Sequence, residues 1–141
     1  MWRKLIKKKR NKYGNKPVSH EGMKFDSGKE FERWLFLKEA EQRGEISNLR
    51  RQVKFQLLPS VVEEYEVQLK TKTKTKTRVV QQAVFYICDF CYEKDGAEVV
   101  EDVKASPNKA VLDKTYTLKK KMMKSLKGID IKEVYDGNDK I

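Results

Sequence analysis

The chain has 141 residues, of which 32 are Lys or Arg and 21 are Asp or Glu, so its net charge is +11. This length corresponds to one domain with a modest core. A strongly basic balance indicates a polyanionic partner, with nucleic acid as the first expectation and a membrane surface as a minor alternative. No apolar run approaches the roughly 20 residues that span a bilayer, and the N-terminus lacks the apolar core of a secretion signal. We therefore expect a cytoplasmic protein without a membrane partner.

Two cysteines and one histidine limit the metal and redox sites that the chain can build. Cys88 and Cys91 are three positions apart, but a structural zinc site needs four Cys or His ligands. A thioredoxin-like pair would stand at the start of a helix, whereas these cysteines lie in a run typical of a strand. We interpret both as small apolar core residues.

The first sixteen residues form a basic arm with eight Lys or Arg residues. Trp2 and Tyr13 stand among them. Such an arm contacts phosphates without sequence preference, although a solvated tail is the alternative interpretation. The candidate nucleic-acid contacts in the arm are Lys7, Lys8, Lys9 and Arg10.

A helix is predicted over residues 28–43. Ser27 and Glu30 have the spacing of a capping box, and Gly44 supplies a stop signal. Apolar residues recur with helical spacing at Phe31, Trp34, Leu35 and Ala40. Glu30 has two interpretations: a cap with no further role, or a first-turn carboxylate that reaches a metal directly or through water.

An alternating pattern over residues 49–58 predicts a half-buried strand. Beyond Pro59, a strict Lys/Thr alternation fills residues 70–77, and a Lys/Thr-rich hairpin is expected near residues 66–78. In an extended conformation all its lysines share one face, which could track a duplex backbone or be a solvated hairpin tip. The candidate contacts are Lys72, Lys74 and Lys76.

A β-hairpin is predicted over residues 85–104, because Asp95-Gly96 separates two runs rich in β-branched and aromatic residues. If these two residues form the loop, Lys94 pairs with Ala97, and every later pair has positions that sum to 191. This register places Asp89 directly opposite Asp102. Lys104 then shares the face of Asp102, and Glu101 points to the other face.

Two carboxylates directly opposite each other, with Cβ atoms about 4.5–5.5 Å apart, repel. A hard divalent cation such as Mg²⁺, or Mn²⁺ as a substitute, would relieve this repulsion, and a neighbouring Lys can orient or deprotonate a water. The alternative is a pair of strand carboxylates that face solvent.

A second helix is predicted from an N-cap at Asp113 to about Gly128. Its expected apolar stripe consists of Thr115, Leu118, Met122 and Leu126. A strand over residues 129–134 follows. The predicted order is helix, three mainly antiparallel strands, helix, strand, which favours an α/β sandwich around a mixed sheet.

The arrangement of Glu30 on a first helix, Asp89 on one strand and Asp102-Val103-Lys104 on the next resembles the PD-(D/E)xK nuclease superfamily. Four segments also resemble an uncharacterised family of small phage and prophage proteins assigned to it: Phe25-Asp26-Ser27-Gly28-Lys29-Glu30, Gln52-Val53-Lys54-Phe55, Tyr86-Ile87-Cys88-Asp89-Phe90 and Val100-Glu101-Asp102-Val103-Lys104. The resemblance runs from about residue 12 to residue 134. Ile87-Cys88 replaces the Pro that names the superfamily, Ala105 stands where the phage family tends to have Gly, and the Lys/Thr tract has no counterpart.

The resemblance implies a restriction-endonuclease-like three-layer core, with a mixed sheet of about four strands flanked by helices in the order α-β-β-β-α-β. The expected parts are a basic arm over residues 1–16, one nuclease-like domain over 17–136 and a tail over 137–141. The implied activity is Mg²⁺-dependent DNA endonuclease cleavage, by a phage-encoded protein that acts in DNA recombination, repair or processing.

The resemblance also implies roles for individual residues. Asp89, Asp102 and the backbone carbonyl of Val103 would hold the metal, with Glu30 as a direct or water-mediated ligand. Lys104 would position the attacking water. Gln52 would lie at the edge of the site, and Lys119 and Lys121 would contact the DNA backbone.

Three other functions are compatible with these residues. One is a Holliday-junction resolvase of the same superfamily, acting as a homodimer. Another is a non-catalytic DNA-binding accessory protein, and a more distant one is a structural protein of a phage particle.

Overall fold

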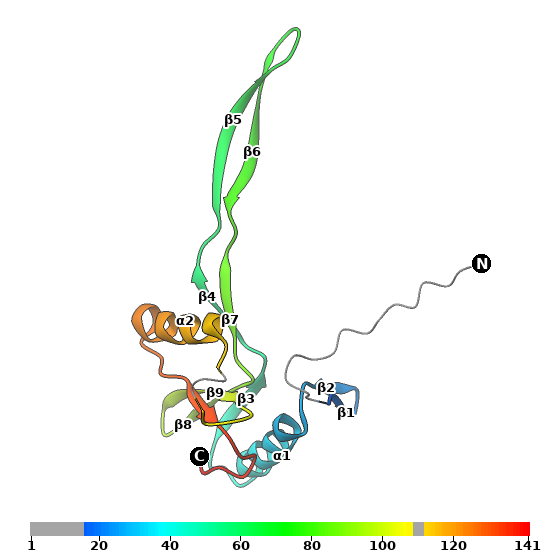
Figure 1. The fold of residues 1–141 in the computed structure, drawn as a ribbon, viewed down its shortest axis with the longest axis vertical. Helices are drawn as coiled ribbons and strands as arrows, with labels where there is room; N and C mark the ends of the chain where they lie inside the picture. Colours follow the sequence, from blue (N-terminus) through cyan, green and yellow to red (C-terminus); the bar gives the residue numbers. More distant parts are fainter. Residues whose placement is uncertain (1–15, 109–111) are drawn as a thin grey trace, which may run out of the picture.

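The chain folds into an α/β domain from which a long two-stranded ribbon projects (Figure 1). The computed structural model describes residues 16–108 and 112–141. The domain contains a four-stranded mixed sheet in the order β10-β9-β8-β3. Its strands are β3 (Ser47–Arg51), β8 (Phe90–Lys94), β9 (Ala97–Val103) and β10 (Lys132–Val134). β3, β8 and β9 are antiparallel neighbours, and β10 runs parallel to β9, so the predicted mixed sheet is confirmed.

The helix α1 (Gly28–Gln42) follows a small hairpin of β1 (Val18–His20) and β2 (Met23–Phe25). The Ser27 side chain accepts a hydrogen bond from the backbone N–H of Glu30, as the capping signal predicts. The predicted apolar stripe is wrong in one respect, because Leu35 is 44% exposed. The buried face consists of Glu30, Arg33, Leu37 and Ala40.

The second helical segment begins as predicted and then changes its winding. The Asp113 carboxylate caps α2 (Lys114–Met122), which continues into the π-helical turn η2 (Met123–Lys127). The predicted stripe is wrong here, because Leu118 and Leu126 are 58% and 54% exposed. The buried side chains are Tyr116 and Met123.

The two helices cover opposite faces of the sheet (Figure 1). On one face, Leu37 and Ala40 of α1 pack with Phe90 and Tyr92 of β8. On the other face, the side chains of the second helical segment pack with Cys88, Cys91 and Val100. Both cysteines are buried and free, which confirms their assignment to the core.

The predicted register of the Asp95-Gly96 hairpin is confirmed. The pairs run from Lys94 with Ala97 to Phe90 with Glu101, and both turn residues have positive φ angles. The strand predicted over residues 85–92 is divided, however, into β7 (Val84–Ile87) and β8, with a bend at Cys88 and Asp89.

The strand predicted over residues 49–58 is divided in the same way. It consists of β3 and β4 (Lys54–Leu58), with Gln52 between them at a φ of 51°. β3 pairs with β8, whereas β4 pairs with β7. The two segments that form β4 and β7 therefore leave the sheet together at the bend and form the start of the ribbon.

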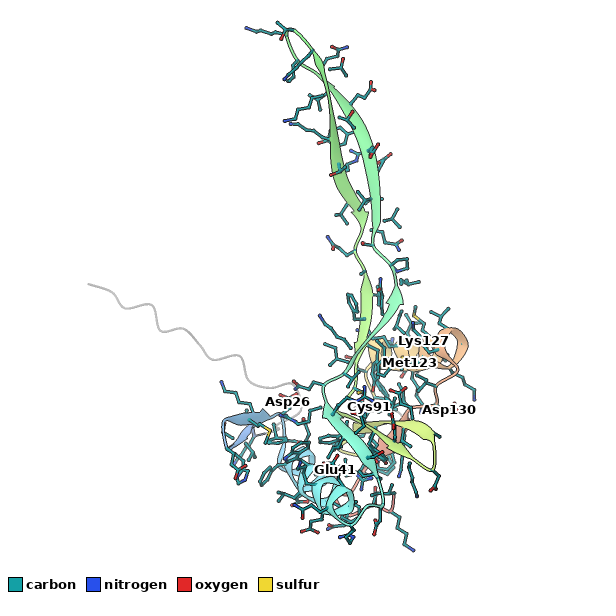
Figure 2. All side chains as sticks on the ribbon, turned by 180° about the vertical axis from the view of Figure 1, so that it is seen from behind. Asp26, Glu41, Cys91, Met123, Lys127 and Asp130 are labelled. Atoms are coloured by element: carbon teal, nitrogen blue, oxygen red, sulfur yellow. The ribbon has the colours of Figure 1, made fainter. Side chains whose placement is uncertain are left out.

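The ribbon extends through β5 (Val61–Gln68) and β6 (Thr73–Gln81). The predicted Lys/Thr hairpin is confirmed, but it extends further toward the domain than residues 66–78. Figure 2 shows side chains that project from both faces of the ribbon, and none of the domain's helices or strands within residues 16–108 and 112–141 packs against its outer part.

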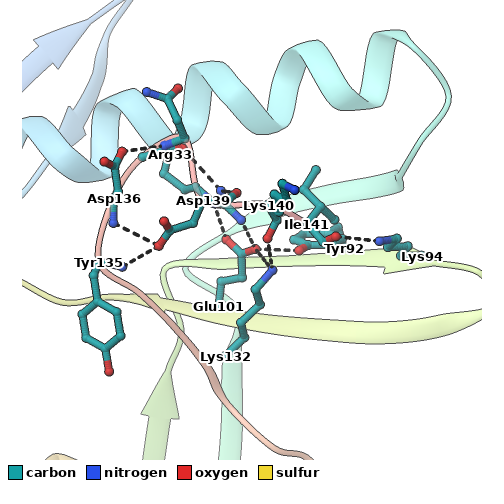
Figure 3. Close-up of polar contacts among 12 residues, drawn as sticks. Arg33, Tyr92, Lys94, Glu101, Lys132, Tyr135, Asp136, Asp139, Lys140 and Ile141 are labelled. Atoms are coloured by element: carbon teal, nitrogen blue, oxygen red, sulfur yellow. Dashed lines mark hydrogen bonds and ion pairs between the residues drawn. The ribbon is translucent and has the colours of Figure 1, made fainter. Parts of the chain in front are cut away.

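A buried ion pair joins α1 to the sheet (Figure 3). The Arg33 guanidinium donates to both carboxylate oxygens of Glu101 at 2.8 and 2.6 Å, and both side chains are fully buried. Arg33 also donates to the carbonyl oxygens of Gly137 and Asp139. Residues 137–141, assigned to a tail from the sequence, thus lie against the domain.

Candidate functional site

The bend between β7 and β8 places Asp89 beside the end of β9. The backbone N–H of Asp89 donates to the Glu101 carbonyl oxygen at 3.1 Å, and because Glu101 is already the partner of Phe90, this bond marks a local irregularity where the ladder ends. The Asp89 carboxylate accepts a hydrogen bond from the Val103 N–H at 2.7 Å. It also lies within hydrogen-bonding reach of Asp102 when one of the two carboxyls is protonated. The facing acid pair that the turn predicts is therefore present.

Asp102 is buried and has two further side-chain partners. The Tyr86 hydroxyl donates to its Oδ2 at 2.7 Å, and the Lys104 ammonium lies 3.1 Å from its Oδ1. Burial and the neighbouring Asp102 charge raise the pKa of Tyr86, so this phenol stays a neutral donor. Lys104 shares the face of Asp102, as predicted, and Glu101 lies on the opposite face with Arg33.

Lys104 is held between Asp102 and an aromatic ring. Its ammonium lies 3.3 Å from the ring centroid of Tyr116, on α2. Such a contact favours a charged amine, because the ring face is electronegative. The Tyr116 hydroxyl is buried and has no hydrogen-bond partner among the described residues.

Burial and nearby charges alter the acidity of Asp89. Loss of solvent, followed by repulsion from Asp102 and Glu30, raises the pKa of Asp89 to about 8. The hydrogen bond from the Val103 N–H acts in the opposite direction. The metal-free pair thus holds one proton near neutral pH.

Glu30 approaches the acid pair from the start of α1. Its Oε2 accepts from the backbone N–H of Asp26 at 3.2 Å, and its Oε1 lies 3.8 Å from the Arg51 guanidinium. Oε1 is buried and has no hydrogen-bond partner among the described residues. Burial, repulsion from Asp26 and a smaller effect of Asp102 raise the pKa of Glu30, against the Asp26 hydrogen bond and Arg51.

The donor set suits a hard divalent cation that keeps part of its water shell. Within residues 16–108 and 112–141, no group of three or more His, Cys, Asp or Glu side chains is placed to hold a metal ion. Mg²⁺ usually retains several waters and binds one or two carboxylates together with substrate phosphates. Asp89 and Asp102 fit this pattern. The partnerless Glu30 oxygen fits a contact through water rather than direct ligation.

A pocket of about 310 Å³ opens between the end of β9, at Val103 and Lys104, and the start of α1. It is lined by Lys104, by Lys16 and Lys29, and by Ser27 and Gly28 at the start of α1. The N-terminus of a helix and three lysines together favour an anion. The Lys29 ammonium donates to the Ala105 carbonyl oxygen at 3.0 Å, which fixes one wall of the pocket.

The other candidate residues lie at different distances from the pair. The backbone N–H of Gln52 donates to the Asp89 carbonyl oxygen at 3.1 Å, but its side chain is exposed, so it supports the bend rather than lining the acid pair. Lys119 and Lys121 are on α2, and Lys72, Lys74 and Lys76 are on the ribbon. Lys7, Lys8, Lys9 and Arg10 lie outside the described residues.

Several residues of the site carry no signal in the sequence. Tyr86, Tyr116 and Arg51 contact Asp102, Lys104 and Glu30 from three different elements. Their positions depend on the bend at Asp89 and on the helix phase, neither of which follows from local periodicity. Lys29, next to the predicted cap, is the exception that a closer examination of the capping box could have found.

A family model described as "Protein of unknown function (DUF1064)" matches residues 10–135. The chain belongs to this family. The match includes Glu30, Asp89, Asp102 and Lys104, together with the whole ribbon. Searches of curated proteins and of solved structures gave no match. In the part of the chain that the structure describes, none of the helices has the length and apolar character to cross a membrane.

Proposed function

We propose that this member of the DUF1064 family is a metal-dependent DNA endonuclease that hydrolyses phosphodiester bonds, with a restriction-endonuclease-like core. One observation carries the proposal: Asp89 and Asp102 face each other at the end of a hairpin, and the Lys104 ammonium lies 3.1 Å from Asp102. The net charge of +11 supports a polyanionic substrate. The resemblance to phage and prophage proteins favours a phage-encoded enzyme of DNA recombination, repair or processing.

Asp89, Asp102 and the carbonyl group of Val103 are the groups that would hold the metal, with Glu30 in contact through water. When bound, a divalent ion such as Mg²⁺ supplies Lewis-acid stabilisation of charge on the phosphate and lowers the pKa of a bound water. The elevated pKa of Asp89 means that metal binding must displace a proton.

The remaining groups orient the substrate. The pocket at the start of α1 would receive a phosphate, because three lysines and the N-terminus of a helix line it and no Asp or Glu side chain does. Lys104 lies both in this pocket and against Asp102, so it can position a water between the acid pair and the phosphate. It would then stabilise the charge that develops on the phosphate oxygens.

The direct test is cleavage of a panel of DNA substrates by the full chain. Linear, nicked, flapped and four-way DNA are incubated with Mg²⁺, with Mn²⁺ and with EDTA. The proposal predicts cleavage with either metal and none with EDTA. Selective, symmetric cutting of the four-way DNA by a dimer would identify a junction resolvase. Binding without cleavage of any substrate by either metal would contradict the proposal and favour a DNA-binding accessory protein.

A further inference from the structure

The outer ribbon has two chemically different faces. Cross-strand partners share a face, and Lys74, Lys76 and Arg78 of β6 are opposite Val67, Tyr65 and Glu63 of β5. On the other face, Thr75 and Thr77 are opposite Glu66 and Glu64. One face therefore carries a row of cations, and the other carries carboxylates and no Lys or Arg.

The cationic face is ordered by contacts within the ribbon. The Arg78 guanidinium donates to the Glu63 carboxylate at 2.8 and 3.0 Å and lies 5.3 Å from the Tyr65 ring centroid. The backbone N–H of Leu69 donates to the Lys72 carbonyl oxygen at 2.8 Å, which closes the tip. An isolated two-stranded hairpin is at best marginally stable in water, so a ribbon with no packed face gains stability from a bound partner.

We propose that the cationic face of the ribbon lies along the backbone of duplex DNA that flanks the cleaved bond. Residues on one face of a strand repeat every two positions, or about 6.8 Å, so the lysines form a regular row of charges for a row of phosphates. A two-stranded ribbon also has the width that the major groove admits. The inference rests on the proposed nuclease function and specifies its substrate as a duplex with an extended flank.

The ribbon is connected directly to the candidate site. Apart from a short irregular stretch at Pro59-Ser60 and Gln82-Ala83, its pairing continues through β4 and β7 to the bend, where the Cys88 N–H donates to the Val53 carbonyl oxygen and the Gln52 N–H donates to the Asp89 carbonyl oxygen. Arg78 and Lys74 precede Asp89 by 11 and 15 residues. At about 3.4 Å per residue these cations lie up to roughly 37 and 51 Å from the acid pair. With about 3.4 Å per base pair, the ribbon would reach roughly 11–15 base pairs along the flank.

A variant with unchanged composition tests the role of the cationic face. The four changes Lys74→Thr, Thr75→Lys, Lys76→Thr and Thr77→Lys shift the alternation by one residue and move two lysines to the other face. Opposite Glu66 and Glu64, the moved lysines gain cross-strand ion pairs, so the ribbon stays folded. The net charge of the chain does not change.

The assay measures binding to duplexes in EDTA, with one flank lengthened from about 6 to 20 base pairs. Wild type should gain affinity until the flank reaches about 11–15 base pairs, and the swapped variant should lose most of this gain. Because two lysines of the variant no longer reach phosphates, the magnitude of the slope of log K against log salt should decrease by about 1.8, which is roughly a 60-fold weaker affinity near 0.1 M salt.

An unchanged affinity and salt slope in the swapped variant would overturn the inference. A change of its oligomeric state in light scattering, with DNA affinity unchanged, would also overturn it and assign the ribbon to protein contacts. The assay contains no metal and needs no cleavage. Flank-dependent binding by a protein that never cuts DNA would therefore support DNA contact by the ribbon and contradict the nuclease function. Metal-dependent cutting without flank dependence would support the nuclease function and contradict DNA contact by the ribbon.

Discussion

The acid pair has two kinds of partner, and they define what each carboxylate can do. Asp89 accepts from a backbone N–H, and Asp102 accepts from Tyr86 and contacts Lys104. The backbone N–H, the Tyr86 hydroxyl and the Lys104 ammonium each stabilise a carboxylate anion. The two carboxylates therefore favour a bound cation, although they repel each other without one. Removal of the charge and removal of the side chain should therefore have different effects.

The raised pKa of Asp89 predicts how the stability of the metal-free protein depends on pH. Between the ordinary value of 3.8 and the folded value of about 8, only the folded state holds this proton. Unfolding releases it, so this contribution to stability decreases as the pH rises toward 8. Asp89→Asn should remove that decrease. Melting temperatures from about pH 5.5 to 9 in EDTA measure the effect, and identical pH profiles of the two proteins would contradict it.

Lys104→Ala and Asp102→Asn should reduce cleavage at least about 100-fold while DNA affinity remains close to that of wild type. The reason is that most of the binding comes from the arm, α2 and the ribbon, so that Lys104, although it lines the pocket at α1, is one of many basic contacts. Cleavage rates and anisotropy titrations of the same preparations separate the two effects. A parallel loss of DNA affinity would show that these residues bind DNA rather than act in cleavage.

Glu101 is adjacent to Asp102 in the sequence but belongs to the structural core on the other face of the sheet. Glu101→Gln should lower stability through the pair with Arg33 and leave the cleavage rate per folded molecule nearly unchanged. Rates normalised to the folded fraction check this. A loss equal to that of Asp102→Asn would contradict the assignment of the two residues to opposite faces.

The contact between α1 and β9 depends on the buried pair of Arg33 and Glu101. Arg33→Met leaves the Glu101 carboxylate buried without its main partner and should cost about 3–5 kcal/mol. The variant with both Arg33→Met and Glu101→Leu should lose clearly less than the sum of the single changes. Urea denaturation of the four proteins completes the cycle, and simple additivity would mean that the two side chains do not stabilise each other.

The parts of the fold that depend on local chemistry could be predicted from the sequence. A two-residue Asp-Gly turn fixes the pairing of its strands, so the positions of Asp102, Lys104 and Glu101 followed from Asp95 and Gly96. The start of α1 followed from Ser27 for the same reason. The bend at Asp89 could not be predicted, because residues 85–92 form one continuous run rich in aromatic and other apolar residues although the chain changes its pairing partner there.

The second helical segment shows another limit of periodicity. The apolar stripe predicted Leu118 and Leu126 on the buried face, but the buried face is the one that carries Tyr116 and Met123, which are seven residues apart. The π-helical turn η2 begins at Met123, so it changes the winding only beyond that residue. The partners of Lys104 and Asp102 depend on the phase of α2 through Tyr116 and on the bend through Tyr86. They became identifiable only in the folded chain.

Positive charge is distributed over the whole molecule: the arm, the pocket at α1, α2 and the ribbon each contribute. With about four to six phosphate contacts, log K against log salt should have a slope of about −4 to −5. Deletion of residues 1–12 should flatten this slope without changing which substrate is cut. Titrations at several salt concentrations test the arm, and an unchanged affinity and slope would make it a solvated tail.

The proposed site requires that Asp89 and Asp102 hold a divalent ion, and this binding can be measured without knowing the substrate. The melting temperature of wild type should rise with Mg²⁺ or Mn²⁺. The reason is that a ligand which binds only the folded state, at 100 times its dissociation constant, stabilises that state by about 2.7 kcal/mol. Asp89→Asn should be neutral or stabilising in EDTA and lose most of this gain, whereas Asp95→Asn, at the exposed turn, should respond like wild type. An Asp89→Asn protein that is strongly destabilised without metal yet responds fully to Mn²⁺ would show that Asp89 is only a structural acceptor for Val103 and would contradict the nuclease proposal.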